Sequence, residues 1–416
     1  MIPWPAPSVP RLPGEGQVLR LHDTSSGALQ PVEPTTGPFT MYVCGITPYD
    51  ATHLGHAATY VTFDLVQRQV RDRGHAVRYV QNVTDVDDPL FERADRDGVD
   101  FRDLARREVA LFREDMTALA VLPPDAYVGV EESMDGIVEK ILALWDAGQA
   151  YPLPVPGESS VDVYLDLATE PEFGQVSGWT REEMLAVFAD RGGDPDRPGK
   201  RDRLDPLLWR GARAGEPTWD GGRLGSGRPG WHIECTAITI DHLGMPFDLK
   251  GGGTDLVFPH HEMSAAQAYG LGGGAVFARH YAHQAMVAYE GEKMSKSKGN
   301  LVLVSRLRHE GIDPMAIRLV LLAQHYRRDW EYTPSLLADA QDRLARWRAA
   351  LSGNVAPAPQ EAVDGIRACL ADDLDSAGAL AVVDAWADRA LAGEGEDPTA
   401  AGVLARTLDA LLGVRV

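Results

Sequence analysis

The sequence has little cysteine: only Cys44, Cys235 and Cys369 occur among its 416 residues. Three cysteines cannot supply the disulfide framework of a small secreted domain, and intracellular chains more often use such residues as metal ligands or bury them. Long apolar runs are also lacking, since none approaches the roughly 20 residues that span a bilayer. The proline-rich start, MIPWPAPSVPRLPG, has no basic-then-apolar secretion pattern. We therefore expect a cytoplasmic protein without membrane contact.

Positive charge is scarce as well. The chain has 40 Lys and Arg against 61 Asp and Glu, a formal net charge of −21. Because affinity for nucleic acid depends largely on neutralising phosphates, this balance argues against a broad polyanion-binding surface, although a local basic patch can sit on an acidic protein. The length suggests two or three domains with a substantial core.

Two short motifs carry most of the functional information. The segment MYVCGITPY at 41–49 is followed by HLGH at 53–56, and KMSKS occupies 293–297. Either motif alone would fit an ordinary loop. Together and in this order, HxGH and KMSKS resemble the paired signatures of the class I aminoacyl-tRNA synthetase fold, which activates carboxylic acids with ATP.

Each motif has a physical role in that chemistry. A helix that opens just after HLGH would point backbone N–H groups and its dipole at a polyphosphate. Gly55 would allow close approach of ATP, and the imidazoles of His53 and His56 would hydrogen-bond phosphate oxygens. Lys293 and Lys296, on a pliable loop, would hold the same charge from the other side. We therefore expect these two histidines and two lysines to be catalytic.

The order of patterned segments predicts an α/β fold. From residue 41 the sequence reads strand, helix (57–72), strand (76–82), and amphipathic helices are expected at 102–120 and 133–147. The segment 151–230 is rich in glycine, proline and charge, as in an insertion between two halves of a nucleotide-binding sheet. We predict a lead-in at 1–38, a doubly wound, Rossmann-like catalytic domain at 39–310 with an insertion at approximately 100–230, and a C-terminal helical bundle at 311–416.

A second group of residues suggests a metal site. Cys44 precedes the HLGH turn, Cys235 lies in WHIEC, and His260 follows GGGTDLVFP. Two thiolates and an imidazole suit zinc, which prefers soft S and N ligands in tetrahedral geometry. The residues are dispersed, so spacing alone equally allows the cysteines to be small buried hydrophobes and the histidine to be a capping group.

Taken together, VCGITPYD, HLGH, GRPGWHIEC, GGGTDLVFPHHE and KMSKSKGN resemble cysteinyl-tRNA synthetase from about residue 38 to 330. The resemblance implies a zinc ion that receives the substrate thiolate, held by Cys44, Cys235 and His260. The fourth ligand of that family, a glutamate four residues after the histidine, is replaced here by Ser264. A hydroxyl is a poor zinc ligand, so we expect three protein ligands.

The same resemblance implies which residues contact the cysteinyl adenylate. Several have hydrogen-bonding side chains suited to an amino acid and a phosphate, although any of them could instead cap a helix or satisfy the core. The residues are Cys44, Gly45, Ile46, Thr47, Thr59, Asn82, Val83, Thr84, Trp231, Gly253, Thr254, Asp255 and Val287.

Several departures from the synthetases point to a related family. The chain is short after KMSKS, the stretch beyond residue 336 is acidic and lacks lysine, and an added RGGDP turn lies at 191–195. These features resemble the mycothiol ligase family, which joins cysteine to the amino group of glucosaminyl-inositol. In that reading Asp190, Arg191 and Asp194 are candidate acceptor contacts; a solvated surface turn is the alternative.

The resemblance therefore implies an ATP-dependent ligase with L-cysteine, Mg²⁺-ATP and glucosaminyl-inositol as substrates and one zinc ion per chain. No tRNA partner is expected, and we expect a monomer. The base for amide formation is not identified by the sequence, with His56 and Asp255 as candidates. Two alternatives stay open: a short cysteinyl-tRNA synthetase, and a non-catalytic paralogue that binds cysteine or AMP.

Overall fold

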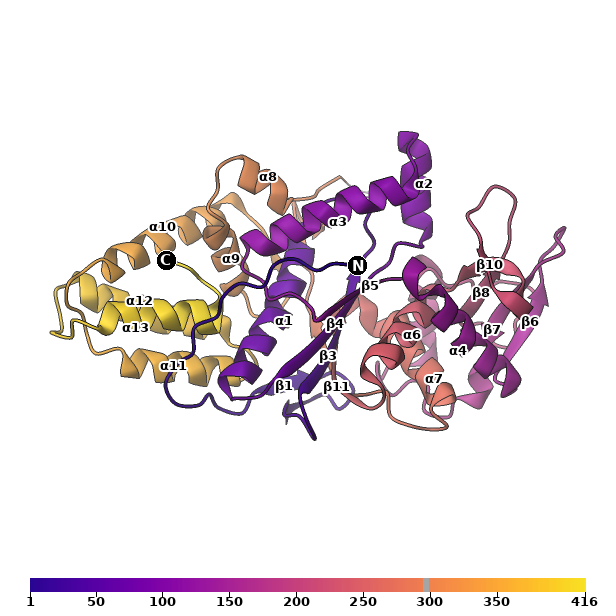
Figure 1. Ribbon diagram of the computed structural model, residues 1–416, viewed down its shortest axis with the longest axis horizontal. Helices are drawn as coiled ribbons and strands as arrows, with labels where there is room; N and C mark the ends of the chain where they lie inside the picture. The colour runs from indigo at the N-terminus through magenta and orange to yellow at the C-terminus, as the bar shows by residue number, and fades with distance from the viewer. Residues whose placement is uncertain (295–298) are drawn as a thin grey trace.

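The centre of the molecule is a parallel sheet of five strands in the order β12-β11-β3-β4-β5 (Figure 1). The computed structural model describes residues 1–294 and 299–416, apart from the side chain of Lys293. The strands are β3 (Phe39–Ile46), β4 (Val77–Val83), β5 (Ala126–Gly129), β11 (Phe247–Gly253) and β12 (Ala278–Gln284). Successive strands lie outward from β3 on one side and from β11 on the other, so the order reverses between β3 and β11. The predicted doubly wound sheet is confirmed, and such a reversal is where open α/β sheets bind ligands.

Both faces of this sheet are buried. Alternate side chains of a strand point to opposite faces, so Met41 and Val43 enter one core whereas Tyr42 and Cys44 enter the other. Helices α1 (Leu54–Asp72) and α3 (Phe101–Ala118) cover the first face. Helices α6 (Trp231–Leu243) and α7 (Glu262–Leu271) cover the second. Cys44 therefore faces α6 and α7.

An insertion separates β5 from α6 and extends to one side of the sheet (Figure 1). It contains an antiparallel sheet in the order β6-β7-β8-β10-β9. The chain enters it through helix α4 (Met134–Asp146), and helix α5 (Arg181–Phe188) follows β7. Its strands are β6 (Ala150–Pro154), β7 (Val161–Leu165), β8 (Leu207–Gly211), β9 (Trp219–Asp220) and β10 (Ser226–Pro229).

The C-terminal part is a helical bundle on the opposite side of the sheet (Figure 1). It is built from α9 (Pro314–Leu322), α10 (Pro334–Leu351), α11 (Gln360–Ala371), α12 (Ser376–Leu391) and α13 (Ala400–Thr407). The helical character expected after residue 311 is thus observed. The remaining elements are β1 (Arg20–Asp23), β2 (Ala28–Pro31), α2 (Asp88–Asp97), β13 (Val287–Tyr289), β14 (Glu292–Lys293), α8 (Val304–His309) and β15 (Trp330–Glu331).

A buried ion cluster joins the bundle to α1. Asp64 accepts a hydrogen bond from Arg68 Nε at 2.8 Å and pairs with Arg318 of α9, and all three side chains are fully buried. Arg318 also donates to the carbonyl of Leu412 at 2.7 Å. The cluster therefore ties the catalytic sheet, the bundle and the chain end together.

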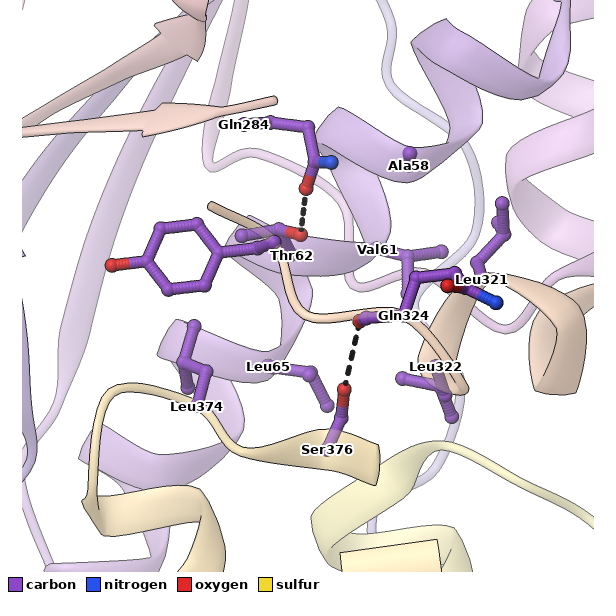
Figure 2. Close-up of a pocket in the computed structure, with 11 residues that line it drawn as sticks. Ala58, Val61, Thr62, Leu65, Gln284, Leu321, Leu322, Gln324, Leu374 and Ser376 are labelled. Carbon is purple, nitrogen blue, oxygen red and sulfur yellow. Dashed lines mark hydrogen bonds between the residues drawn. The ribbon is translucent and has the colours of Figure 1, made fainter. Parts of the chain in front are cut away.

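A small pocket marks the same junction (Figure 2). Thr62 of α1 donates to Gln284 at the end of β12, and Ser376 of α12 donates to the carbonyl of Gln324. These contacts belong to the interface between sheet and bundle. Across the described residues, no helix has the length and apolar character needed to cross a membrane.

Candidate functional site

A cavity of about 330 Å³ opens at the carboxyl ends of β3 and β11, where the strand order reverses. Eleven of the predicted site residues line it: Cys44, Gly45, Ile46, Thr47, His53, His56, Thr59, Trp231, Gly253, Asp255 and Val287. The remaining wall includes Tyr49, Gly55, Tyr60, Leu256, Gln284, Ala285, Met286 and Met294, of which only Gly55 was considered from the sequence. Strand termini that meet at one sheet edge explain why residues so far apart in the chain converge.

The HLGH motif forms the turn and first residues of α1. His53 is the N-cap, and its Nδ1 accepts a hydrogen bond from the Gly55 N–H at 3.1 Å. The rings of His53 and His56 stack with centroids 3.8 Å apart. Both imidazoles and the start of the helix therefore face the cavity together, as expected for a phosphate-binding end of a helix.

The lysine motif is only partly described. Lys293 lies at the end of the β13–β14 hairpin, whereas Lys296 lies outside the described residues. Met294, between them, is buried in the cavity wall. The hairpin thus brings the start of KMSKS to the same cavity as HLGH.

Three residues that were predicted to contact the adenylate lie on β4 or just after it. They contact the backbone of the neighbouring strand β3. The Gly45 N–H donates to Asn82 Oδ1 at 2.8 Å, and Asn82 Nδ2 donates to Thr84 Oγ1 at 3.0 Å. A Cβ on Gly45 would lie 1.6 Å from the Asn82 carbonyl, so glycine is required there. Asn82, Val83 and Thr84 are fully or nearly fully buried and do not appear in the cavity lining, and neither does Thr254.

Two thiols and an imidazole meet at one end of the cavity. Potential ligand atoms of Cys44, Cys235 and His260 all lie within 4.8 Å of one another. Cys44 lies near the end of β3 and points to the second face of the sheet, where Cys235 lies in α6 and His260 precedes α7. All three are buried. The three residues predicted as metal ligands are thus brought together, in a donor set that suits zinc.

Further histidines surround this cluster, and the sequence analysis did not identify them. His261 Nε2 lies 3.3 Å from Cys44 Sγ, and its Nδ1 lies 2.7 Å from His283 Nε2. His232 Nδ1 lies 3.1 Å from His260 Nδ1, and Trp231 stacks on His260 at 4.4 Å. Such hydrogen-bonded neighbours orient metal ligands. The tandem His260-His261 and the position of His232 within WHIEC were the available signals, whereas His283 lies in no quoted motif.

Burial sets the protonation of this group. It lowers the pKa of His232 and His261 well below the ordinary histidine value, with nearby positive groups adding to the effect. Burial alone would raise the pKa of Cys44, but a hydrogen bond with Cys235 and the charge of Lys250 lower it overall. Burial raises the pKa of Cys235. Burial therefore favours the neutral imidazoles of His232 and His261, and the surroundings of Cys44 favour its thiolate relative to an isolated thiol; these are the forms that bind metal.

The added turn at 190–195 lies against the loop that carries the metal-site histidines. Arg191 Nη1 donates to the Asp255 carbonyl at 3.1 Å and also to that of Phe258. Asp194 pairs with Lys200 at 2.9 Å and accepts from the Tyr164 hydroxyl. Asp190 is exposed. These contacts lie within the protein, and acceptor binding by the turn remains a prediction.

Comparison with known proteins agrees with this geometry. Residues 30–342 match the model of the tRNA synthetases class I (C) catalytic domain. Over 412 residues the chain is 59% identical to the L-cysteine:1D-myo-inositol 2-amino-2-deoxy-alpha-D-glucopyranoside ligase of Streptomyces griseus subsp. griseus, covering 99% of both chains. The ligase of the same name from Geodermatophilus obscurus is 59% identical over 421 residues, covering 100% of this chain and 99% of the relative.

Solved structures with low identity share the fold. Mycobacterium tuberculosis methionyl-tRNA synthetase in complex with methionyl-adenylate superposes with a TM-score of 0.63 at 17% identity, covering 90% of each chain. A LeuRS from Agrobacterium radiobacter, in a ternary complex with tRNA and LeuAMS, gives 0.65 at 11% identity, covering 92% of this chain and 84% of that one. The chain belongs to the class I aminoacyl-tRNA synthetase-like family, within the group of these cysteine ligases.

Proposed function

We propose that this protein activates L-cysteine with ATP as cysteinyl adenylate and transfers the cysteinyl group to the amino group of glucosaminyl-inositol, releasing AMP and pyrophosphate. The observation that carries the proposal is the end-to-end identity of 58–59% to ligases named for this reaction. The cavity supports it, because the HLGH motif and Cys44 of the thiol and histidine cluster line the same cavity.

The donor set fits a zinc ion. Cys44, Cys235 and His260 supply two S ligands and one N ligand, all buried, which is the pattern of a site with one position left for substrate. Ser264, at the position where the synthetase resemblance implies a fourth ligand, directs its hydroxyl to the His232 carbonyl at 3.4 Å. When bound, the ion would hold the cysteine sulfur as a thiolate and so discriminate against serine.

Activation would use the opposite end of the cavity. The substrate carboxylate attacks the α-phosphate of Mg²⁺-ATP, and pyrophosphate leaves. His53 and His56, at the start of α1, would stabilise the phosphate charge together with the helix N-terminus, and Lys293 and Lys296 would complete the binding of pyrophosphate.

Amide formation follows at the activated carbonyl. The neutral sugar amine attacks this carbon, the C–N bond forms, and AMP leaves with the electrons of the C–O bond. Asp255 lines the cavity between the two ends and is suited to bind an ammonium or a ribose hydroxyl. His56 and Asp255 remain the candidates for the base. We expect a monomer that works in the cytoplasm and does not use tRNA.

The test separates ligase from synthetase. With ATP and cysteine, purified protein should release AMP when glucosaminyl-inositol is added and should form a cysteinyl amide detectable by mass spectrometry. Bulk tRNA should do neither. Cysteinylated tRNA as product, with no response to the aminosugar, would contradict the proposal.

The metal has its own test. Elemental analysis should find about one zinc per chain, and Cys44→Ser should lose most of it because serine is a poor ligand. Pyrophosphate exchange into ATP should depend on cysteine and reject serine by several orders of magnitude. Full zinc content in both Cys44→Ser and Cys235→Ser would show that the ion is held elsewhere.

A further inference from the structure

Lys250 lies fully buried beside the thiol and histidine cluster. It stands in the middle of β11, paired with Tyr42 of β3 on one side and with Tyr281 of β12 on the other. Its ammonium nitrogen lies 4.8 Å from the ring centre of Tyr42 and 4.9 Å from that of Phe277. Among the residues that the structure describes, Nζ has no hydrogen-bond partner.

Within the described part of the chain, no carboxylate forms a hydrogen bond with this ammonium. Asp248, two residues earlier on the strand, accepts hydrogen bonds from Thr40 and faces Arg279 instead. Burying an unpaired charge is costly, and contact with two aromatic rings recovers only part of that cost. A buried, unpaired ammonium is expected where a negative charge lies beside it once the site is loaded.

The groups that sense Lys250 belong to the metal cluster. Tyr42, whose ring the ammonium contacts, enters the same core as Cys44 and Cys235, so Lys250 lies on the face of the sheet that carries the two sulfur atoms. Burial and nearby positive charges, Lys250 among them, lower the pKa of His232 and His261, whereas at Cys44 and His283 the carboxylate of Asp255 opposes Lys250.

We propose that Lys250 is the fixed counter-cation of the loaded thiol site and a positioning residue for cysteine selection; this inference rests on the proposed function. Two protein thiolates, the substrate thiolate and a neutral imidazole around Zn²⁺ carry one net negative charge. The ammonium of Lys250 balances it inside the core. A serine hydroxyl in place of the substrate thiolate would leave the ammonium unbalanced, so the charge favours cysteine over serine.

The test is the Lys250→Met variant, which keeps the length of the side chain and removes its charge. Zinc affinity is measured by competition with a chelator, and cysteine affinity by calorimetry on zinc-loaded protein without ATP. We expect cysteine to bind at least about 10-fold more weakly. Zinc affinity without cysteine should change little, because Zn²⁺ with two protein thiolates and a neutral imidazole carries no net charge. In the cobalt-substituted protein, cysteine should produce a weaker thiolate-to-cobalt absorption in the variant than in the wild type.

The sign of the stability change distinguishes this role from a merely structural one. Without metal, Lys250→Met should unfold at the same or a higher temperature than the wild type, because an unpaired buried charge has been removed. Lys250→Arg, which keeps the charge, should retain most of the cysteine affinity. Lys250→Gln provides a second neutral variant.

Lys200 offers a matched control. Its side chain is also buried over two aromatic rings, Tyr164 and Phe188, but it pairs with Asp194 away from the cluster. Lys200→Met should leave cysteine affinity unchanged. Unchanged cysteine binding in Lys250→Met, a metal-free Lys250→Met protein that does not fold, or an equal loss of cysteine affinity in Lys200→Met would overturn the inference. Aminosugar ligation by the wild type, assayed in parallel, tests the proposed function separately.

Discussion

At the scale of the residue, Gly55 shows how a motif glycine is used. An added Cβ would lie 2.8 Å from Cε1 and 2.9 Å from Nδ1 of His53, the ring that caps α1. The sequence interpretation assigned Gly55 to close approach of ATP. The structure adds a second reason, which is that the histidine itself folds over this position to reach the Gly55 N–H. Glycine in HLGH therefore positions the side chain of His53, which we propose to be catalytic.

Gly55→Ala should accordingly disturb His53. We expect cysteine-dependent pyrophosphate exchange to fall by roughly 10²-fold, as when one group that stabilises transition-state charge is lost. The free energy of unfolding should fall by about 1 kcal/mol, because the hydrogen bond with which His53 caps α1 is lost. Exchange assays and urea unfolding measure the two effects.

The control for this variant is Gly402→Ala in α13. Its Cβ would meet only Arg406 Nη1, at 3.5 Å. Alanine is a better helix former than glycine, so this change should raise stability by up to about 1 kcal/mol and leave exchange unchanged. Equal rates of pyrophosphate exchange in Gly55→Ala and in the wild type would contradict the role of Gly55 in positioning His53.

At the scale of the element, the insertion contacts the loop of the candidate metal site, and Arg191 makes one set of these contacts. Arg191 follows α5, and its guanidinium bonds to two carbonyls of the 255–258 loop and lies over the Trp179 ring. Trp179 in turn packs on Phe258, just before the His260 ligand. The turn therefore holds the loop that carries Asp255 and His260.

Arg191→Ala should loosen this loop. We expect faster amide hydrogen exchange over residues 254–262 and about 10-fold weaker zinc binding, because a support of the metal ligand is lost. Arg181→Ala, in the same insertion but paired on the surface with Asp202, is the control and should change neither. If amide hydrogen exchange over residues 254–262 were the same in Arg191→Ala as in the wild type, the contact of Arg191 would not be needed to hold the loop.

The elements also show what sequence could and could not predict. The strand-helix-strand order around HLGH and the parallel sheet followed from motifs that carry their own physical reasons. The convergence of Cys44, Cys235 and His260 was implied by the resemblance to cysteinyl-tRNA synthetase, because spacing alone left it open. Lys250, His232 and His283 could not be predicted as neighbours of the cluster, because strand register and packing of α6 bring them there. The backbone role of Asn82 was missed for the same reason, since Gly45 and Asn82 meet only across the sheet.

At the scale of the whole molecule, buried carboxyls shape the response to pH. Burial raises the pKa of Asp85, Asp87 and Asp115 to about 6, whereas salt bridges with Arg68 and Arg318 outweigh burial and lower the pKa of Asp64. A carboxyl with a raised pKa binds its proton more tightly in the folded state than in the unfolded chain. Its contribution to stability is therefore present below pH 4 and is lost as pH rises through 6.

Asp85→Asn isolates one of these groups. Asp85 Oδ1 accepts the Glu131 N–H at 3.0 Å, and the asparagine carbonyl can accept the same bond without a charge. A shift of the Asp85 pKa from 3.8 to about 6 corresponds to at most about 3 kcal/mol in the free energy of unfolding. The variant should therefore become more stable relative to the wild type by up to this amount between pH 4 and pH 8. Urea unfolding across that range measures the difference. Asp220 is an exposed carboxyl that accepts a hydrogen bond from the Gly222 N–H. The free energy of unfolding of Asp220→Asn should therefore change with pH in the same way as that of the wild type. If Asp85→Asn also ran parallel, burial of Asp85 would not be a source of the pH response, and the carboxyl would stay ionised by virtue of its backbone hydrogen bonds.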